Sequence, residues 1–324
     1  MDILENIDDD KRGQYEGLKL IHPEKNPKLY FVMLGPTVNK WISNMFYKKK
    51  INSYITNGLK LSTEITNKSI LHNYTKKNHT DLFNRYFMDQ FDIDDKFEVF
   101  DTMKPDTWYI LKVIGGRSGE GQIVFNNNTK GKEMAKKFIT NHVQPSYKRD
   151  TKTKWIAQEY IKEPYLLKRK KFHMRVLILL FDNKIYFYNY VLMIPATKEY
   201  NSSPDLITDK EIHDTHLRAT PITEKTNLIR DYIGDKHWED VYERIKVFIT
   251  ELKDIDLFKN SCYESPKCFR FLGIDVILTK DNKLKCIEIN YSPRLKHKGY
   301  TIRVFEGLTD IIINKKPTKY YTEL

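Results

Sequence analysis

The sequence predicts a fold of the α+β or α/β class in which antiparallel hairpins alternate with helices. Short apolar, β-branched runs such as WYILKVI, QIVF and WIAQEYI read as strands, and many are joined by brief polar turns. Apolar residues at helical spacing predict helices around 68–77, 131–140, 237–255 and 302–313. Repeated strand–helix–strand units, which a doubly wound sheet would need, are missing.

The size of the chain allows a large buried core. With 324 residues, of which 40% are hydrophobic and 13% aromatic, the chain is too apolar for wholesale disorder, and its length favours two or three sub-domains. The longest apolar run, 176–181, is far shorter than the roughly 20 residues of a membrane helix, so no membrane partner is expected.

Cysteine usage and the first residues predict the compartment. Cys262, Cys268 and Cys286 lack the spacing of a zinc site or a disulfide framework. The acidic start MDILENIDDDKR does not resemble a secretory signal. A reducing, cytoplasm-like compartment is therefore expected.

The formal net charge of +12 is consistent with an anionic partner: nucleic acid, nucleotide, an acidic membrane surface or an acidic protein tail. A biased composition rich in Lys, Asn and Ile would give the same charge as a merely solvated surface. The sign of the charge does not choose between these alternatives, so the placement of the cations must.

A Gly-rich loop follows the strand WYILKVI. Its backbone amides could cradle phosphates, with Lys112 on the preceding strand close by. The loop contains Gly115, Gly116, Gly119 and Gly121. A P-loop and a dinucleotide-binding loop both open a helix, whereas this loop returns to a strand. The remaining interpretations are a hairpin lid over a nucleotide and a plain hairpin turn.

The next two strands are WIAQEYI and the run that begins at Lys171. The first ends before Pro164, which suits an interdomain hinge as well as a simple buried strand. Alternation along the second places Lys171, His173 and Arg175 on one face. Phe172, Met174 and Val176 then share the other face. The cationic face is either a phosphate-binding surface or a solvated edge.

The segment GIDVILTKDNKLKCIEIN predicts a β-hairpin that carries two carboxylates and an amide on one face. A turn near Asp281 and Asn282 sets Asp275 opposite Glu288, with Asn290 beside them. Ile274, Val276, Ile287 and Ile289 are then expected on the opposite face. Opposed like charges destabilise a sheet, but hard oxygen donors at this spacing suit Mg²⁺. Alternatively, the acids splay into solvent or pair with lysines.

Taken in order, these motifs resemble the ATP-grasp fold and, within it, the tubulin tyrosine ligase-like family. The similar segments are the strand ending at Lys112, the loop GGRSGEGQI, the hinge QEYIKEPYLL, the run KFHMR, and the metal-type motifs GIDVIL and CIEINYSP. The resemblance covers about residues 28–313. It implies an N-terminal sub-domain (1–58), a central one (59–165) and a C-terminal one (166–324), with ATP between the last two.

The resemblance also assigns roles. Lys112, Gly119, Lys171 and His173 would lie against the nucleotide, and 158–161 (Gln158, Glu159, Tyr160, Ile161) would line the adenine. Asp275, Glu288 and Asn290 would hold Mg²⁺, and Arg175 would face the polyphosphate. The sequence differs from the family in His173, where an acidic residue is usual, and in His216-Leu217-Arg218-Ala219, where Arg218 adds a cation. Arg175 and Arg218 are the candidate catalytic residues.

The implied activity is ATP- and Mg²⁺-dependent ligation of a free amino acid to a protein carboxylate through an acyl phosphate. The family's substrates are acidic tubulin tails that receive tyrosine, glutamate or glycine, so a cytoplasmic, microtubule-associated protein is implied. One alternative is an impaired pseudo-ligase that binds nucleotide and an acidic partner. A nucleic-acid-binding protein is a third interpretation, but the sequence has no identifiable readout motif.

Overall fold

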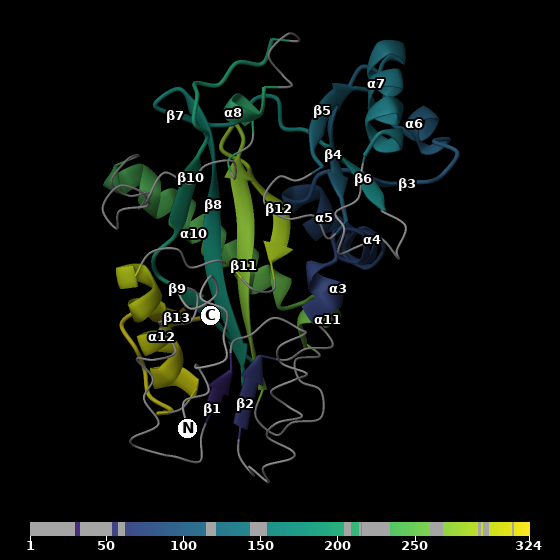
Figure 1. The fold of residues 1–324 in the computed structure, drawn as a ribbon. Helices are drawn as coiled ribbons and strands as arrows, with labels where there is room; N and C mark the ends of the chain where they lie inside the picture. The colour runs from purple at the N-terminus through teal and green to yellow at the C-terminus, as the bar shows by residue number, and fades with distance from the viewer. Residues whose placement is uncertain are drawn as a thin grey trace, which may run out of the picture.

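Two β-sheets and the helices around them form the described part of the chain (Figure 1). The computed structural model describes residues 30–32, 54–57, 62–114, 121–142, 154–203, 209–213, 215, 234–259, 268–290, 293, 298–312 and 314–324. Gly119 and Arg218 lie outside these residues, as do the rest of the loop 115–120 and an apolar pattern of helical spacing at 38–47.

The larger sheet is nine-stranded and is built around β8 (Lys170–Phe181) and β11 (Cys268–Leu278), which pair antiparallel. Its path is β1-β2-β11-β8-β9-β13. The other strands on this path are β1 (Tyr30–Val32), β2 (Tyr54–Asn57), β9 (Lys184–Tyr188) and β13 (Tyr321–Glu323). Off the path, β7 (Leu166–Leu167) and β10 (Leu192–Pro195) pair with β8, and β12 (Leu284–Asn290) pairs with β11.

The smaller sheet has four antiparallel strands in the order β3-β6-β4-β5. They are β3 (Gln90–Ile93), β6 (Trp155–Glu159), β4 (Trp108–Val113) and β5 (Ile123–Asn126). Helix α7 (Thr129–Thr140) and the short α6 (Val99–Thr102) contribute Ala135 and Phe100 to the core beneath this sheet. The Gly-rich segment therefore connects two paired strands, β4 and β5, as the sequence predicts.

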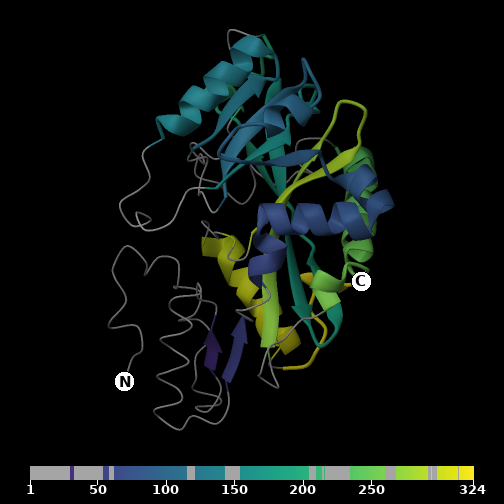
Figure 2. The ribbon, with the colours of Figure 1, turned by 90° about the vertical axis from the view of Figure 1, so that its right-hand side faces the viewer.

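Helices cover both faces of the larger sheet. One face packs Phe172, Met174 and Val176 against α10 (Asp235–Leu252), and α3 (Ser62–Thr66), α4 (Lys68–Asn78), α5 (Thr80–Tyr86) and α11 (Asp256–Lys259) extend this core. The other face packs Leu177 and Leu179 against α12 (Lys298–Ile312). Figure 2 shows α10 and α12 on opposite sides of β11. The predicted alternation along β8 is confirmed.

The predicted helices are found with slightly different ends, because side-chain caps set where a helix begins. The Asn67 side chain accepts hydrogen bonds from the Ser69 and Ile70 amides and so starts α4. Asn128 accepts from the Gly131 amide and starts α7. Short elements without a periodic pattern were not predicted; they include β3, β13 and α8 (Lys210–His213).

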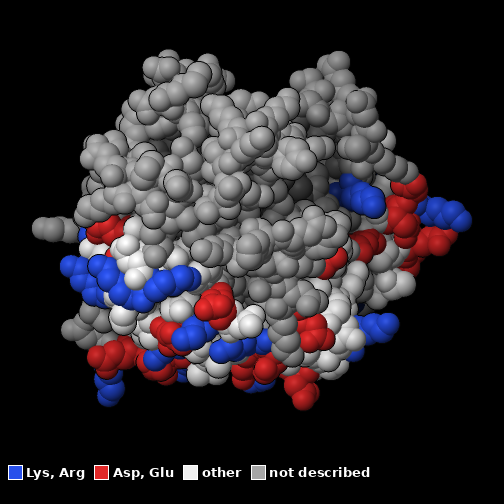
Figure 3. Space-filling model, turned by 90° about the horizontal axis from the view of Figure 1, so that it is seen from below, with Lys and Arg blue, Asp and Glu red and all other residues white. Residues whose placement is uncertain are grey.

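The described surface carries both signs of charge. On the face seen in Figure 3, Lys and Arg side chains are interspersed with Asp and Glu side chains among the described residues. Surface ion pairs such as Lys184 with Glu323, at 2.7 Å, show the same mixing. None of the helices within the described ranges is long and apolar enough to cross a membrane.

At Gly131, in the first turn of α7, the helix backbone packs closely against the end of β5. A Cβ at this position would lie 1.8 Å from the Asn126 carbonyl oxygen. We expect Gly131→Ala to lower the free energy of unfolding by about 1–3 kcal/mol, because the helix must move away from β5. Urea denaturation measures the loss, and Lys130→Ala, an exposed site on the same helix, should change stability by less than about 0.5 kcal/mol. Equal stability of the two variants would contradict the close approach.

Candidate functional site

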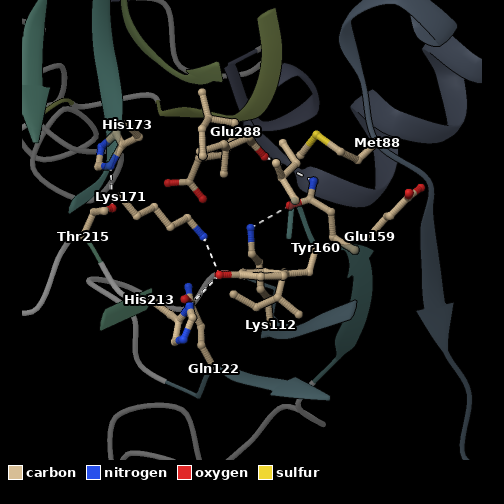
Figure 4. Close-up of a pocket in the computed structure, with 15 residues that line it drawn as sticks. Met88, Lys112, Gln122, Glu159, Tyr160, Lys171, His173, His213, Thr215 and Glu288 are labelled. Atoms are coloured by element: carbon tan, nitrogen blue, oxygen red, sulfur yellow. Dashed lines mark hydrogen bonds between the residues drawn. The ribbon is translucent and has the colours of Figure 1, made fainter. Parts of the chain in front are cut away.

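A cleft lies between the two sheets, and side chains from both of them line it (Figure 4). The smaller sheet contributes β4, β6 and the residues after β6, and the larger sheet contributes β8, β11 and β12. Seven of the eight predicted nucleotide residues line it: Lys112, Gln158, Glu159, Tyr160, Ile161, Lys171 and His173. The eighth, Gly119, lies outside the described residues.

Lys112 is a buried cation on the floor of the cleft. Only 5% of the residue is exposed, and its Nζ donates to Gln158 Oε1 at 2.7 Å, across the β4–β6 pair. Gln158 Nε2 in turn donates to the Ile287 carbonyl at 3.3 Å, which ties the smaller sheet to the hairpin of the larger one. Burial lowers the pKa of Lys112 from 10.5 to about 8, although the nearby Glu288 carboxylate raises it. An anion in the cleft would favour the charged ammonium.

Lys171, Tyr160 and His213 meet at one oxygen on the wall of the cleft (Figure 4). Lys171 Nζ donates to the Tyr160 hydroxyl at 3.0 Å and lies 4.1 Å from the centre of the Tyr160 ring. The Tyr160 hydroxyl is also 2.6 Å from His213 Nδ1. Burial raises the pKa of Tyr160 well above 10, so the phenol keeps its proton.

His173, the residue that differs from the family pattern, joins the cleft to the hairpin. Its Nδ1 lies 2.5 Å from the Thr215 hydroxyl, and its Nε2 lies 3.7 Å from Asp275 Oδ1. The residue is 1% exposed. It is therefore held between the cleft wall that contains Lys171 and the hairpin that carries Asp275.

The predicted pairing of Asp275 with Glu288 is confirmed. It results from two departures from the predicted hairpin, each of one residue, that cancel each other. The connection is a five-residue loop, Thr279 to Lys283, with Asn282 at φ 59°, so Leu278 pairs with Leu284. This is a one-residue shift from the expected turn. A β-bulge at Ile287 adds one residue to β12 and restores the register at Asp275.

The bulge also corrects one orientation. Ile274, Val276 and Ile289 point into the core of the larger sheet as predicted. Ile287 instead lines the cleft, because the extra residue breaks the alternation of side chains. The prediction for Ile287 was therefore wrong.

The three predicted metal residues come together. Asn290 Nδ2 donates to Asp275 Oδ2 and to Glu288 Oε1, both at 3.0 Å. Cations balance the two acids: Arg175 Nε and Nη2 each donate to Asp275 at 2.8 Å, and Lys68 Nζ lies 3.0 Å from Glu288 Oε2. Asp275 is fully buried, and the side chain of Arg175 is 11% exposed. The predicted alternative, in which an acid pairs with a lysine, thus holds for Glu288.

This donor set fits Mg²⁺. Two carboxylates and an amide oxygen are hard oxygen ligands of the kind that Mg²⁺ prefers. Asn290 would present its Oδ1 after a half-turn of its amide, and amide orientation follows from the hydrogen-bond network. Within the described ranges, no three His, Cys, Asp or Glu side chains form a metal-type group, so a metal here would depend on Asn290 as the third ligand.

Several residues of the site were not predicted. His213 and Thr215 come from α8 and the turn after it, Gln122 follows the Gly-rich loop, and Lys68 opens α4. His213 and Thr215 could have been suspected from their polar side chains at a spacing of two. For Lys68 there is no signal, because its partner Glu288 lies far along the chain.

Known proteins match this chain in part. A probable tubulin–tyrosine ligase of Schizosaccharomyces pombe is 23% identical over 168 residues, 49% of this chain and 41% of that protein. The tubulin polyglutamylase ttll-4 of Caenorhabditis briggsae is 29% identical over 174 residues, 46% of this chain and 29% of that protein. The match thus spans less than half the length of either relative.

The fold matches a solved structure along almost its whole length. The C-terminal domain of K. lactis Pby1, described as an ATP-grasp enzyme that interacts with the mRNA decapping enzyme Dcp2, aligns with a TM-score of 0.59 and 17% identity. The alignment covers 96% of this chain and 95% of that one. The predicted ATP-grasp fold is confirmed.

The family follows from the sequence profile. The profile of the Tubulin-tyrosine ligase family matches residues 43–322, which include both sheets apart from β1 and the last residue of β13. The chain therefore belongs to the tubulin-tyrosine ligase family.

Proposed function

We propose that this chain is an ATP- and Mg²⁺-dependent ligase that joins a free amino acid to a carboxylate of a protein. One observation carries the proposal: a single cleft holds the buried cations Lys112 and Lys171, and the Asp275–Glu288–Asn290 group lies on the adjoining hairpin. Cations for phosphates and oxygen donors for a metal are the two provisions that a phosphoryl-transfer site needs.

The proposed reaction has two steps. The acceptor carboxylate attacks the γ-phosphorus of ATP, which forms an acyl phosphate and releases ADP. The amino group of the amino acid then attacks the acyl carbon, an amide bond forms, phosphate leaves, and the amine gives up a proton. When bound, Mg²⁺ would neutralise phosphate charge and orient the polyphosphate.

The residues divide this work by position. Backbone and side chains from Gln158 to Ile161 would hold the base, and Lys112 and Lys171 would hold phosphate charge or the base edge. Asp275, Glu288 and Asn290 would bind the metal. Arg175, now bidentate to Asp275, would turn to the γ-phosphate, where Arg218 is proposed to add a second cation.

The acceptor we propose is an acidic protein tail, with a tubulin C-terminal tail as the first choice. Its support is the family and the names of the relatives, tubulin–tyrosine ligase and tubulin polyglutamylase. The net charge of +12 suits a polyanion. Such an acceptor would place the protein in the cytoplasm, on microtubules.

Mass spectrometry of tubulin tails tests the proposal. Tubulin is incubated with the full chain, ATP, Mg²⁺ and a mixture of amino acids. We expect a mass increase equal to one or more tyrosine, glutamate or glycine residues, with ADP formed in proportion. Omission of ATP is the control. If the chain binds ATP but releases no ADP with any amino acid, the proposal that it is a ligase is refuted.

That second outcome defines the rival, a pseudo-ligase that holds nucleotide and an acidic partner. The observation that favours it is His173, which stands at the family's acidic position and contacts both Thr215 and Asp275. The relative from K. lactis interacts with a decapping enzyme, so partners other than tubulin belong in the same assay.

A further inference from the structure

His213 is a titratable side chain on the cleft wall to which the proposed function gives no role. It lies at the end of α8, in a segment that is fixed to the residues after β10: the Lys198 amide and the Thr197 hydroxyl both donate to the Glu211 carbonyl, at 3.0 Å each. His213 is 8% exposed, and the edge of its ring packs on Tyr200, with ring centres 5.4 Å apart. A buried, well-packed imidazole in a cleft is held in one orientation.

The contact with Lys171 fixes the direction of one hydrogen bond at the Tyr160 hydroxyl. A Lys ammonium can only donate, so the Tyr160 oxygen accepts from Lys171. The phenol proton is then available to His213 Nδ1, 2.6 Å away. We take Nδ1 as the acceptor, with the ring proton on Nε2, because this tautomer lets the Tyr160 hydroxyl accept from Lys171 and donate to His213. A protonated His213 would bring a second cation to an oxygen that already accepts from Lys171.

Tyr200 completes the network behind His213. Its hydroxyl donates to the Lys162 carbonyl at 2.5 Å, two residues beyond Tyr160. The network therefore starts on β8, passes through the Tyr160 hydroxyl to α8, and returns to the segment that follows β6. It joins the three parts of the chain that form this wall of the cleft.

We propose that His213 is a positioning residue for nucleotide binding: it accepts a hydrogen bond from the Tyr160 hydroxyl and thereby holds the Lys171 ammonium at the cleft wall. The inference rests on the proposed function in that the occupant of the cleft is ATP. His213 does not touch the reacting atoms. It keeps the phenol oxygen turned toward Lys171, so the cation is in place before the nucleotide arrives.

The second contact of the same segment supports this role. Thr215, two residues after His213, meets His173, which lies two residues after Lys171 on β8. The segment thus holds two side chains of β8 at matching spacing, one through Tyr160 and one directly. Its position against β8 sets the shape of the wall, and His213 supplies a hydrogen-bond acceptor for the Tyr160 hydroxyl that binds Lys171.

The test is ATP affinity, measured by titration calorimetry of the full chain with Mg²⁺. His213→Leu, which keeps the bulk and loses the acceptor, should weaken ATP binding about tenfold. His213→Asn should recover most of the affinity, because its Oδ1 stands where Nδ1 stands in His213. Tyr160→Phe should weaken binding by a similar factor, and the double variant Tyr160→Phe/His213→Leu no more than Tyr160→Phe alone.

A matched control separates positioning from packing. His237→Leu makes the same change at a histidine stacked on Tyr165 outside the cleft, with ring centres 5.3 Å apart, and should leave ATP affinity unchanged. If His213→Leu does not fold, Tyr160→Phe tests the same contact. Unchanged affinity in His213→Leu or, failing that, in Tyr160→Phe overturns the inference alone, as does an additive double variant. A wild-type chain that binds no ATP overturns the proposed function with it.

Discussion

Glu288→Gln should lower ligase turnover by about a thousandfold while the chain stays folded. The change replaces one carboxylate oxygen of the proposed metal group with an amide nitrogen, which cannot bind a cation. Its structural cost is small, because the amide of Gln can still accept the hydrogen bond from Asn290, and the ion pair with Lys68 lies where both side chains are 15% exposed. ADP release in the presence of acceptor and amino acid measures the loss, and circular dichroism checks the fold.

Substitution of Asp275 should lower both activity and stability, whereas Glu288→Gln should lower activity alone. Asp275 is fully buried and binds Arg175 through both oxygens, so Asp275→Ala leaves a buried guanidinium without its carboxylate. We expect it to lose activity and about 3–5 kcal/mol of stability. The control is Asp281→Ala at the exposed tip of the same hairpin, which should keep turnover. Wild-type turnover in Glu288→Gln would refute the metal assignment.

ATP binding is expected to weaken about tenfold per pH unit above pH 8. Burial lowers the pKa of Lys112 to about 8, so the free protein loses this cation as the pH rises through that value. Bound phosphates favour the ammonium and raise its pKa, so binding takes up a proton. Calorimetry in two buffers of different ionisation enthalpy should count about 0.9 proton at pH 9.

Lys112→Met should bind ATP more weakly at pH 7 and lose this pH dependence. Lys285→Met is the matched control: burial lowers the pKa of Lys285 too, but its Nζ donates to the Asn84 and Phe87 carbonyls and it does not line the cleft. It should keep the slope of the wild type. A wild-type affinity that is flat from pH 7.5 to 9.5 would contradict the titration of Lys112 in this range, and unchanged ATP affinity in Lys112→Met at pH 7 would rule out Lys112 as the phosphate cation.

The titration of Lys112 should also appear in the stability of the protein without ATP, where its effect on pH dependence has the opposite sign to its effect on ATP affinity. The folded pKa of Lys112 lies below the ordinary value of 10.5, so the unfolded chain holds more protons between pH 8 and 10.5. The free energy of unfolding of the wild type relative to Lys112→Met should therefore rise with pH in this window, by up to about 1.4 kcal/mol per pH unit. A falling difference would contradict the burial of the ammonium.

The sequence by itself determined the local elements and the faces of the central strands. Period-two alternation placed Lys171, His173 and Arg175 together, because β8 is apolar on its other face and cannot be turned over without burying those charges. The order of motifs was enough to predict the ATP-grasp fold. The same alternation brought Asp275, Glu288 and Asn290 to one face of the hairpin.

Only the tertiary structure decided the bulge in β12 and which distant residues meet at the site, because local sequence patterns do not specify contacts between elements. No pattern in β12 predicts the bulge at Ile287, where the carbonyl accepts a hydrogen bond from Gln158 of the smaller sheet. Lys68 and His213 reach the site from helices far away in the sequence. Periodicity reports which face of an element is buried, whereas a site between two sheets depends on which elements meet, and only the packed chain fixes that.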